Sequence, residues 1–419
     1  MRPPLALIPQ HFGCLVFDRR TSRYYPFDRQ CARLLARLVE RPIRRVVEHH
    51  PEAAAVKAFY QRFQRLGFFD LNGRLAAGIL DLDPPQDHLA GPLAVHLEVT
   101  DACAERCAHC FASAGAGSAG PDLLSFRELD RLFAELAAMG SFRLGITGGE
   151  PLLRPDLLEL LDSAVDHGLI PCVTTSGLLL DERLARGLGA RPLAWLNVSL
   201  EGATAATSDR VRGEGTFDRV LANLLLLREH ARFTLAFTVT RESAREIEAC
   251  ARLAAEVGAS AAVFRPLYPV GRACSHPELM PDYDDYIDGI ARLESLDGTL
   301  EVMEPFGPLA RVSSQARVYT APGCGAANLV ASVSCTGVVN PCSFLGPAHD
   351  AGSIRERPFA EIWHHSPVFK DLRAGGRGEA PPRAGAFEGG CRARALALSG
   401  GADRSDPWFE AWKERARAG

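Results

Sequence analysis

Apolar and polar positions repeat in a regular order along the middle of the chain. From Leu93 onward, short apolar runs of strand character are each followed by a stretch of helical periodicity. The strands are predicted to end near residues 100, 147, 175, 202, 240 and 266, with helices at 125–140, 155–167, 181–187, 216–230 and 243–257. Six such units predict an α/β fold in which helices cover a parallel sheet, either open or curved into a barrel.

Unusual residues follow the ends of four predicted strands. A cysteine cluster follows the first strand, Gly-Gly-Glu-Pro at 148–151 the second, Thr-Ser-Gly at 175–177 the third, and Glu201 ends the fourth. In parallel α/β folds, the loops after the strand carboxyl ends carry the chemistry. We therefore expect these four loops to meet on one rim.

The two ends of the chain lack this repeat. Residues 13–18 and 23–27 have strand character, helical stretches lie near 30–38 and 51–66, and a short strand ends near 72–73, which suggests a small unit of winged-helix character. Past residue 300, a Gly- and Pro-rich segment has a hairpin pattern at 328–342 and a helix near 359–365. The predicted domains are 1–88, 89–300 and 301–419.

Composition narrows the possible partners. The formal net charge of −4 argues against electrostatic binding to nucleic acid or an anionic membrane. No apolar run is long enough to span a bilayer, and the proline-interrupted N-terminus does not resemble a signal peptide. A cytoplasmic protein is expected, in which the 12 cysteines bind metal or pack in the core rather than form disulfides.

The cysteines fall into three groups. Cys103, Cys107 and Cys110 crowd one loop, and four more occur in the last hundred residues. The other five are expected to be buried small side chains: Cys14, Cys31, Cys172, Cys250 and Cys274. Three thiolates on one loop can ligate three irons of a cubane and leave the fourth iron open, whereas structural zinc takes four protein ligands. His109, inside the loop, is a further possible ligand or a bystander.

The run CAERCAHCF together with Thr147 and the Gly-Gly-Glu-Pro motif resembles the radical S-adenosylmethionine (SAM) superfamily over about residues 93–300. The resemblance implies a partial (β/α)6 barrel with a [4Fe-4S] cluster on Cys103, Cys107 and Cys110. It also implies that the amino and carboxylate groups of S-adenosylmethionine chelate the open iron.

The same resemblance implies a set of cofactor-binding residues. They are Gly148, Gly149, Glu150, Pro151, Ser176, Ser199, Glu201 and Arg212. The glycines let backbone approach a ligand, and the motif is expected to hold the methionine ammonium, whose charge Glu150 complements. Arg212 matches a basic residue placed near the cofactor carboxylate, while Ser176 stands where the family commonly has Asn. Without the cysteines, an ordinary turn would explain the glycines equally well.

The C-terminal cysteines resemble the SPASM/twitch auxiliary-cluster domain. Cys324-x12-Gly337-x4-Cys342 fits its opening half, and Cys391 fits a later position. Other cysteines of the full domain are replaced here by Gly378, Pro381, Phe387 and Phe409. One auxiliary [4Fe-4S] cluster is therefore predicted on Cys324, Cys342 and Cys391. Cys335 is the best fourth ligand, with an open iron or an ordinary buried thiol as alternatives, and a four-cysteine zinc site as the alternative for the whole set.

The N-terminal segments FGCLVFDRRTSRYYPFDRQCARLL and LGFFDLNG resemble the PqqD-like recognition element of ribosomal peptide maturation. In that family a leader peptide adds as a strand to the sheet edge beside the third helix. A dimerisation or packing domain is the alternative.

Together these resemblances imply a radical SAM peptide maturase of the SPASM/twitch subclass. A 5′-deoxyadenosyl radical would abstract hydrogen from a precursor peptide bound by residues 1–88, with flavodoxin or ferredoxin as electron donor. Alternatives are an enzyme acting on a small molecule, in tetrapyrrole or redox-cofactor biosynthesis, and a scaffold without catalysis. The sequence assigns no general acid or base; Arg265, Tyr268 and Arg272 follow the sixth strand and either face the substrate or lie in surface and packing positions.

Overall fold

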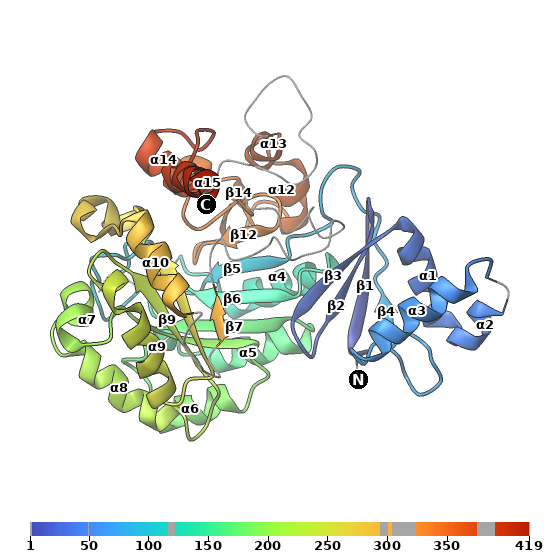
Figure 1. The fold of residues 1–419 in the computed structure, drawn as a ribbon, viewed down its shortest axis with the longest axis horizontal. Helices are drawn as coiled ribbons and strands as arrows, with labels where there is room; N and C mark the ends of the chain where they lie inside the picture. Colours follow the sequence, from blue (N-terminus) through green and yellow to red (C-terminus); the bar gives the residue numbers. More distant parts are fainter. Residues whose placement is uncertain are drawn as a thin grey trace.

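The computed structural model describes residues 2–48, 50–115, 122–293, 301–303, 324–374 and 390–418. The N-terminal sheet and its helices lie on one side of the molecule, the larger α/β unit on the other, and the C-terminal helices beside the larger unit (Figure 1). The two sheets have four and ten strands, in the orders β3-β2-β1-β4 and β11-β10-β9-β8-β7-β6-β5-β12-β13-β14.

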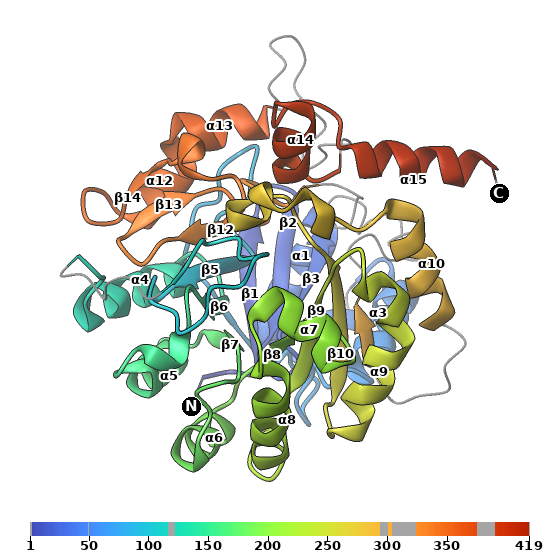
Figure 2. The same ribbon diagram turned by 90° about the vertical axis from the view of Figure 1, so that its left-hand side faces the viewer.

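The six predicted parallel strands are confirmed. They are β5 (Ala94–Glu98), β6 (Arg143–Thr147), β7 (Ile170–Thr175), β8 (Trp195–Leu200), β9 (Thr234–Val239) and β10 (Ala261–Pro266). The helices of this unit are α4 (Phe126–Ala138), α5 (Leu157–Asp166), α6 (Glu182–Gly189), α7 (Ala205–Arg212), α8 (Thr216–Leu227), α9 (Ile247–Glu256) and α10 (Tyr283–Leu293). The helices cover the outside of the curved sheet (Figure 2), as expected for a partial (β/α)6 barrel.

Local signals set the helix positions. Ser125 caps α4, and the Glu128 side chain accepts a hydrogen bond from the Ser125 backbone at 2.8 Å, which completes a capping box. Leu129, Leu132 and Leu136 of this helix are buried at helical spacing against the sheet. The sheet therefore has an apolar outer face covered by helices.

The inner face of the barrel carries polar side chains among apolar ones. Val95, Leu144 and Val198 point to the outer core, whereas Asn197 and Ser199, on alternate positions of β8, line a cavity. Because side chains alternate along a strand, each barrel strand contributes both to the core and to this cavity.

The C-terminal region joins the same sheet. β12 (Val330–Val333) pairs in parallel with β5 and antiparallel with β13 (Val338–Asn340), and β14 (Gly352–Ser353) pairs with β13. The hairpin predicted at 328–342 is confirmed, but its pairing with the barrel was not predicted. At the other edge, β11 (Glu301–Met303) pairs with β10. Helix α12 (Phe359–His365) was predicted; α13 (Pro367–Arg373), α14 (Arg392–Ser399) and α15 (Pro407–Ala418) were not.

The N-terminal sheet contains β1 (Leu5–Gln10), β2 (Gly13–Asp18), β3 (Arg23–Asp28) and β4 (Ala77–Ile79), with helices α1 (Arg29–Glu40), α2 (Ile43–Val47) and α3 (Ala53–Gln64). The prediction of a short strand near 72–73 is wrong: an isolated bridge joins Phe69 to Leu75, and β4 begins two residues later. Sequence reasoning missed β1, whose run LALIPQ lacks alternation because both faces of the sheet are covered.

One face of this sheet packs against α1–α3 and the other against the barrel. The Phe17 ring stacks on Phe142 with centroids 5.0 Å apart. The Tyr24 hydroxyl donates to the Gly140 carbonyl at 3.0 Å and accepts from the Phe142 N–H at 2.7 Å. The N-terminal unit is thus fixed to the barrel by a buried interface.

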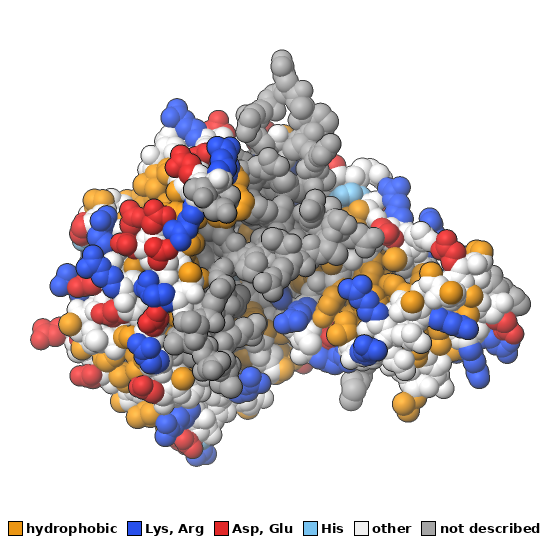
Figure 3. All heavy atoms as spheres, in the orientation of Figure 1, with side chains coloured by type: hydrophobic (Ala, Val, Ile, Leu, Met, Phe, Trp, Pro, Cys, Tyr) orange, Lys and Arg blue, Asp and Glu red, His pale blue; other side chains and the backbone are white. Residues whose placement is uncertain are grey.

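On the face seen in Figure 3, acidic and basic side chains are interspersed over the barrel helices. Pairs such as Arg415 with Asp284 and Asp288 lie on this surface. Among the described residues, no helix has the length and apolar character that a bilayer span requires.

Candidate active site and a second cysteine site

The loop after β5 carries Cys103, Cys107 and Cys110, and all three line a cavity of about 250 Å³ at the mouth of the barrel. The Cys103 N–H donates to the Gly115 carbonyl at 2.8 Å, and the Cys110 N–H to the Cys107 carbonyl at 3.2 Å. Arg272, which follows β10, donates to the Cys107 carbonyl at 2.9 Å. The cysteine loop is thus folded on itself and fastened to the far edge of the barrel.

The Gly-Gly-Glu-Pro motif lies directly against this loop. A Cβ on Gly148 would lie 2.3 Å from the Thr100 carbonyl oxygen, and one on Gly149 would lie 2.1 Å from that of Ala102. Gly148 also has a φ of +130°, which favours glycine. The Gly149 N–H donates to the Thr100 carbonyl at 2.7 Å. Both glycines line the cavity, and they are required there because the two loops pair through their backbones.

Glu150 is 1% exposed. Its carboxylate accepts hydrogen bonds from the N–H groups of Leu152 at 3.0 Å and Ser176 at 2.8 Å, and from the Thr175 hydroxyl at 2.7 Å. Pro151 starts a short 3-10 helix directly after it. Glu150 therefore ties the loop after β6 to the loop after β7. Within the described residues no basic side chain pairs with it, so its charge is available to complement the ammonium of a ligand.

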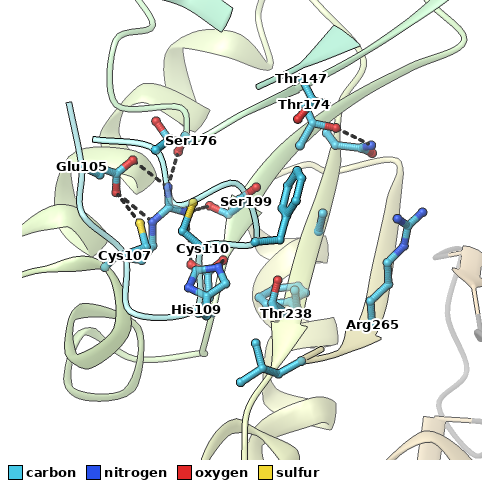
Figure 4. A pocket seen from close by; sticks show the side chains of 18 of the residues that line it. Glu105, Cys107, His109, Cys110, Thr147, Thr174, Ser176, Ser199, Thr238 and Arg265 are labelled. Atoms are coloured by element: carbon cyan, nitrogen blue, oxygen red, sulfur yellow. Dashed lines mark hydrogen bonds and ion pairs between the residues drawn. The ribbon is translucent and has the colours of Figure 1, made fainter. Parts of the chain in front are cut away.

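A buried ion cluster joins the cysteine loop to β8 and α7 (Figure 4). Arg212 contacts the Glu105 carboxylate at 3.0 Å and the Glu201 carboxylate at 3.1 Å, and all three side chains are at most 4% exposed. Burial alone would raise the pKa of Glu201, but the charges of Arg212 and His109 outweigh it and hold that pKa below its usual range. Arg212 was predicted to lie near the cofactor carboxylate; two protein carboxylates already neutralise it, so its main contact is with the loop that carries the cysteines.

Two buried polar atoms of this cluster have no hydrogen bond among the described residues. They are Nδ1 of His109 and Oε1 of Glu201, although His109 Nε2 lies 3.4 Å from that oxygen. Both residues line the cavity together with Ser176 and Ser199. The predicted Glu201, Ser176 and Ser199 thus converge with His109, which the sequence left as a bystander. These groups offer hydrogen bonds to a polar ligand.

The cysteines fit an iron–sulfur cluster. Burial raises the pKa of Cys103 and Cys107, so their thiolates need the positive charge that bound iron supplies. Among the residues the structure describes, no three His, Cys, Asp or Glu side chains are close enough to share one metal ion. In a cubane each thiolate binds a different iron, so the sulfurs do not converge on one atom.

A second site brings together Cys324, Cys342 and Cys391, which interact electrostatically. Burial, followed by repulsion from Cys324, raises the pKa of Cys342 to about 12 and that of Cys391 to about 11. Cys391 precedes α14, and its N–H donates to Asp406 at 2.8 Å. Three segments distant in the sequence therefore meet, as the predicted auxiliary set requires.

Cys335 has different neighbours from these three cysteines, which argues against its predicted role as the fourth ligand. Its carbonyl accepts a hydrogen bond from the Leu124 N–H at 2.8 Å, and its pKa is raised to about 11 by burial and then by Asp101 and Glu98, which belong to the barrel. The reason is the hairpin: Cys335 occupies the turn between β12 and β13, whereas Cys342 follows the other end of β13. These surroundings favour the alternative that Cys335 is an ordinary buried thiol.

The remaining cysteines and replaced positions have varied surroundings. Cys14 and Cys250 are buried as expected, and Cys31 and Cys172 are half-buried. Cys274 is exposed, so the prediction of burial is wrong for it. Phe409 packs on Trp412 with ring centroids 5.4 Å apart. The substituted positions 378, 381 and 387 lie outside the described residues.

Aromatic side chains connect the two cysteine sites. Phe111 follows Cys110, and its ring lies 5.0 Å from that of Phe344, two residues after Cys342; Phe344 lies 5.1 Å from Tyr268. All three rings line the cavity. The second cysteine site therefore abuts the wall of the cavity that holds the first.

Comparisons with known proteins agree with this geometry. Residues 97–254 match the model of the radical SAM superfamily, and residues 324–385 match the SPASM model, described as an iron-sulfur cluster-binding domain. The AdoMet-dependent heme synthase of Methanosarcina barkeri is 32% identical over 340 residues, which cover 76% of this chain and 96% of the relative. The mycofactocin maturase MftC of Mycobacterium tuberculosis is 31% identical over 330 residues, which cover 76% and 83%.

The chain therefore belongs to the radical SAM superfamily, and its cofactors are S-adenosylmethionine and iron–sulfur clusters. Among solved structures, Streptococcus suis SuiB bound to the precursor peptide SuiA has a TM-score of 0.69 at 14% identity, covering 98% of this chain and 99% of SuiB. This likeness extends the shared fold to the N-terminal unit.

Proposed function

We propose that the protein is a radical SAM peptide maturase that modifies a ribosomally made precursor. The observation that carries this proposal is the N-terminal sheet packed on the barrel, within a fold that SuiB shares over nearly its full length. When bound and reduced, the cluster on Cys103, Cys107 and Cys110 supplies reductive cleavage of S-adenosylmethionine to a 5′-deoxyadenosyl radical. The chain's own residues position the cofactor and close the cavity around the substrate.

The peptide would bind through residues 1–88, along β3. β3 is the terminal strand of its sheet, so its outer backbone groups have no strand neighbour among the described residues. Phe59 and Phe63 of α3 lie beside it, with rings 5.9 and 5.2 Å from that of Phe27. A strand added here gains backbone hydrogen bonds from β3 and apolar contacts from α3. Pro26 lacks an N–H, so pairing would use the other backbone groups of this strand.

Charge suggests the kind of leader. Residues 1–88 contain fourteen Lys and Arg against nine Asp and Glu, whereas the whole chain has a net charge of −4. Lys57, Arg62 and Arg65 lie exposed on or directly after α3. An acidic leader would be attracted to this surface, and its binding would weaken as salt increases.

Turnover also requires an electron donor, for which we propose a flavodoxin or ferredoxin. A small-molecule substrate is the second candidate, because the heme synthase of Methanosarcina barkeri is as similar as the maturase MftC. The N-terminal unit favours the peptide.

The test uses the full chain, reconstituted anaerobically, reduced with dithionite and supplied with S-adenosylmethionine and synthetic peptides encoded beside its gene. We expect 5′-deoxyadenosine together with a mass change in one peptide, and neither in a variant with Ala at 103, 107 and 110. If 5′-deoxyadenosine forms and a porphyrin carboxylate, but no peptide, changes mass, the second candidate is correct.

A further inference from the structure

Arg265 lines the active-site cavity and has no charged or hydrogen-bonding partner among the described residues. It lies near the end of β10, in register with Thr238 of β9, and its solvent-accessible side chain lines the cavity. Figure 4 shows it across the cavity from Glu105 and Cys107, with no interaction drawn to it. Within the described part of the chain, no hydrogen bond or ion pair of its guanidinium occurs.

Arg212, the other arginine that lines the cavity, is engaged, and so are Arg272 and Arg394 near the two cysteine sites. Arg212 pairs with two carboxylates, Arg272 donates to the carbonyls of Cys107 and Ala114, and Arg394 pairs with Asp406 at 2.7 Å. These contacts give the three arginines a structural role in holding the loops and helices around the two sites. Arg265 makes no such contact, so packing and loop anchoring do not account for a guanidinium that faces the cavity.

The surroundings of Arg265 favour an anion. His96, on the inner face of β5, has its pKa lowered to about 4 by burial and then by the charge of Arg265, so it is neutral at pH 7. Arg265 is then the charged member of that pair. Thr238, Thr174 and Asn197 line the same cavity with neutral hydroxyl and amide groups, and the Asn197 amide donates to the Thr174 hydroxyl at 3.3 Å. These groups can hydrogen-bond a carboxylate without adding negative charge.

We propose that Arg265 is the anchor of a subsite for a carboxylate of the substrate, with Thr238 and Asn197 as neutral neighbours. The planar guanidinium offers two parallel N–H groups that match a carboxylate. This inference rests on the proposed function and narrows it: the modified peptide presents an acidic side chain or its C-terminal carboxylate next to the reacting atom. The carboxylate of S-adenosylmethionine has the same chemistry, and the experiment must separate the two sources.

The probe is glutarate, with its uncharged diamide glutaramide for comparison, added to the fully reconstituted chain with S-adenosylmethionine bound. Binding is measured by anaerobic calorimetry, which needs neither turnover nor a peptide. We expect Arg265→Gln to weaken glutarate binding by about ten- to a hundred-fold, the range for a charge-assisted hydrogen bond. Arg265→Lys should retain part of the affinity, glutaramide should bind no better to the native protein than to Arg265→Gln, and S-adenosylmethionine should bind equally to all forms.

The matched control is Arg252→Gln, which removes an exposed arginine from α9 and should leave glutarate binding unchanged. Equal iron content and circular dichroism in every variant show that each is folded. Unchanged glutarate affinity in Arg265→Gln overturns the proposal. So does a loss of S-adenosylmethionine affinity with no loss of glutarate affinity, because Arg265 would then hold the cofactor. Failure of the peptide assay alone would instead count against the peptide-maturase function, since this measurement contains no peptide.

Discussion

The two cysteine sites are built in opposite ways. Cys103, Cys107 and Cys110 lie on one short loop after β5, whereas Cys324, Cys342 and Cys391 come from a loop before β12, the end of β13 and the start of α14. The first three cysteines lie close together because they are close in sequence, within residues 103–110. The second set is close only when the hairpin and the C-terminal helices are folded, so its ligands cannot be identified from spacing alone.

Each site is held by a buried arginine, but at different points. Arg212 forms one ion pair with Glu105, which lies in the cysteine loop, and another with Glu201, which follows β8. Arg394 pairs with Asp406, both 0% exposed, and Asp406 accepts from the Cys391 N–H. The barrel site is thus fixed by charge on the ligand loop, and the second site by a carboxylate that orients the backbone of one ligand.

The largest effect is expected from removing ligands. With two cubane clusters the protein should hold about eight irons, and Ala at 103, 107 and 110 should leave about four and abolish 5′-deoxyadenosine formation. Cys391→Ala should also leave about four, because it removes a ligand of the second site. Iron and sulfide analysis with EPR after anaerobic reconstitution measures both.

Cys335→Ala is the matched control, since it removes a buried thiol that the fold places apart from the other three. It should retain about eight irons. Loss of about four irons in Cys335→Ala, with none lost in Cys391→Ala, would show that the second site is assembled differently from the geometry described above.

Arg212→Met should destabilise the protein strongly. The substitution leaves Glu105 and Glu201 buried without their cation. Removing one partner of a buried ion pair costs about 3–5 kcal/mol. Because two carboxylates lose their partner here, we expect a loss at the upper end of this range, about 5 kcal/mol. The free energy of unfolding, measured by urea denaturation under anaerobic conditions, should fall by that amount. Iron should also be lost faster to a chelator from the barrel cluster.

Arg210→Met is the control from the same helix. Arg210 pairs with Glu242 at 3.2 Å, and both side chains are largely exposed, so the expected change is about 0–1 kcal/mol. Equal losses in the two variants would mean that the buried cluster does not stabilise the ligand loop.

Asp406→Asn should have a smaller effect, about 3 kcal/mol on unfolding, at the lower end of the same range. The amide oxygen can still accept from the Cys391 N–H, but Arg394 loses its counter-charge. Because Asp406 orients one ligand of the second site, Cys391, a chelator should remove iron faster from the second cluster of this variant. Iron loss from the first cluster should be unchanged. Accelerated loss from the barrel cluster instead would show that the two sites are not independently held.

The comparison also explains how far the sequence predicted this molecule. The six barrel strands, the start of the helix near residue 125 and the convergence of the cysteine loop with Gly148, Gly149 and Glu201 followed from local patterns. Those signals come from residues that are close in sequence or from a repeated βα unit. Such a unit can be connected in only a few topologies.

What the sequence missed depends on long-range pairing. The neighbours of Cys335 could not be predicted, because spacing does not show which end of a hairpin faces a partner. β1 was missed because a strand covered on both faces has no alternation. Arg212 pairs with Glu105, which lies 107 residues away in sequence, and Arg265 has no partner among the described residues. Both are properties of the folded cavity, which no motif encodes.

The smallest expected effect is on how stability depends on pH, and it concerns a histidine of the C-terminal region. His364 of α12 lies with its Nδ1 2.8 Å from His88 Nε2, and burial, then His88 and Arg373, lowers its pKa from 6.5 to about 4. In the unfolded chain this histidine binds a proton near pH 6.5, whereas in the folded protein it does so only near pH 4. The contribution of neutral His364 to the free energy of unfolding is therefore complete above pH 6.5 and is lost as the pH falls toward 4. His364→Asn should flatten the fall in the unfolding midpoint between pH 6.5 and 4.5, measured by thermal denaturation, while exposed His365→Asn should leave it unchanged. An identical slope in both variants would place the pH sensitivity elsewhere, with His96 in the barrel, whose pKa is also about 4, as the next residue to test.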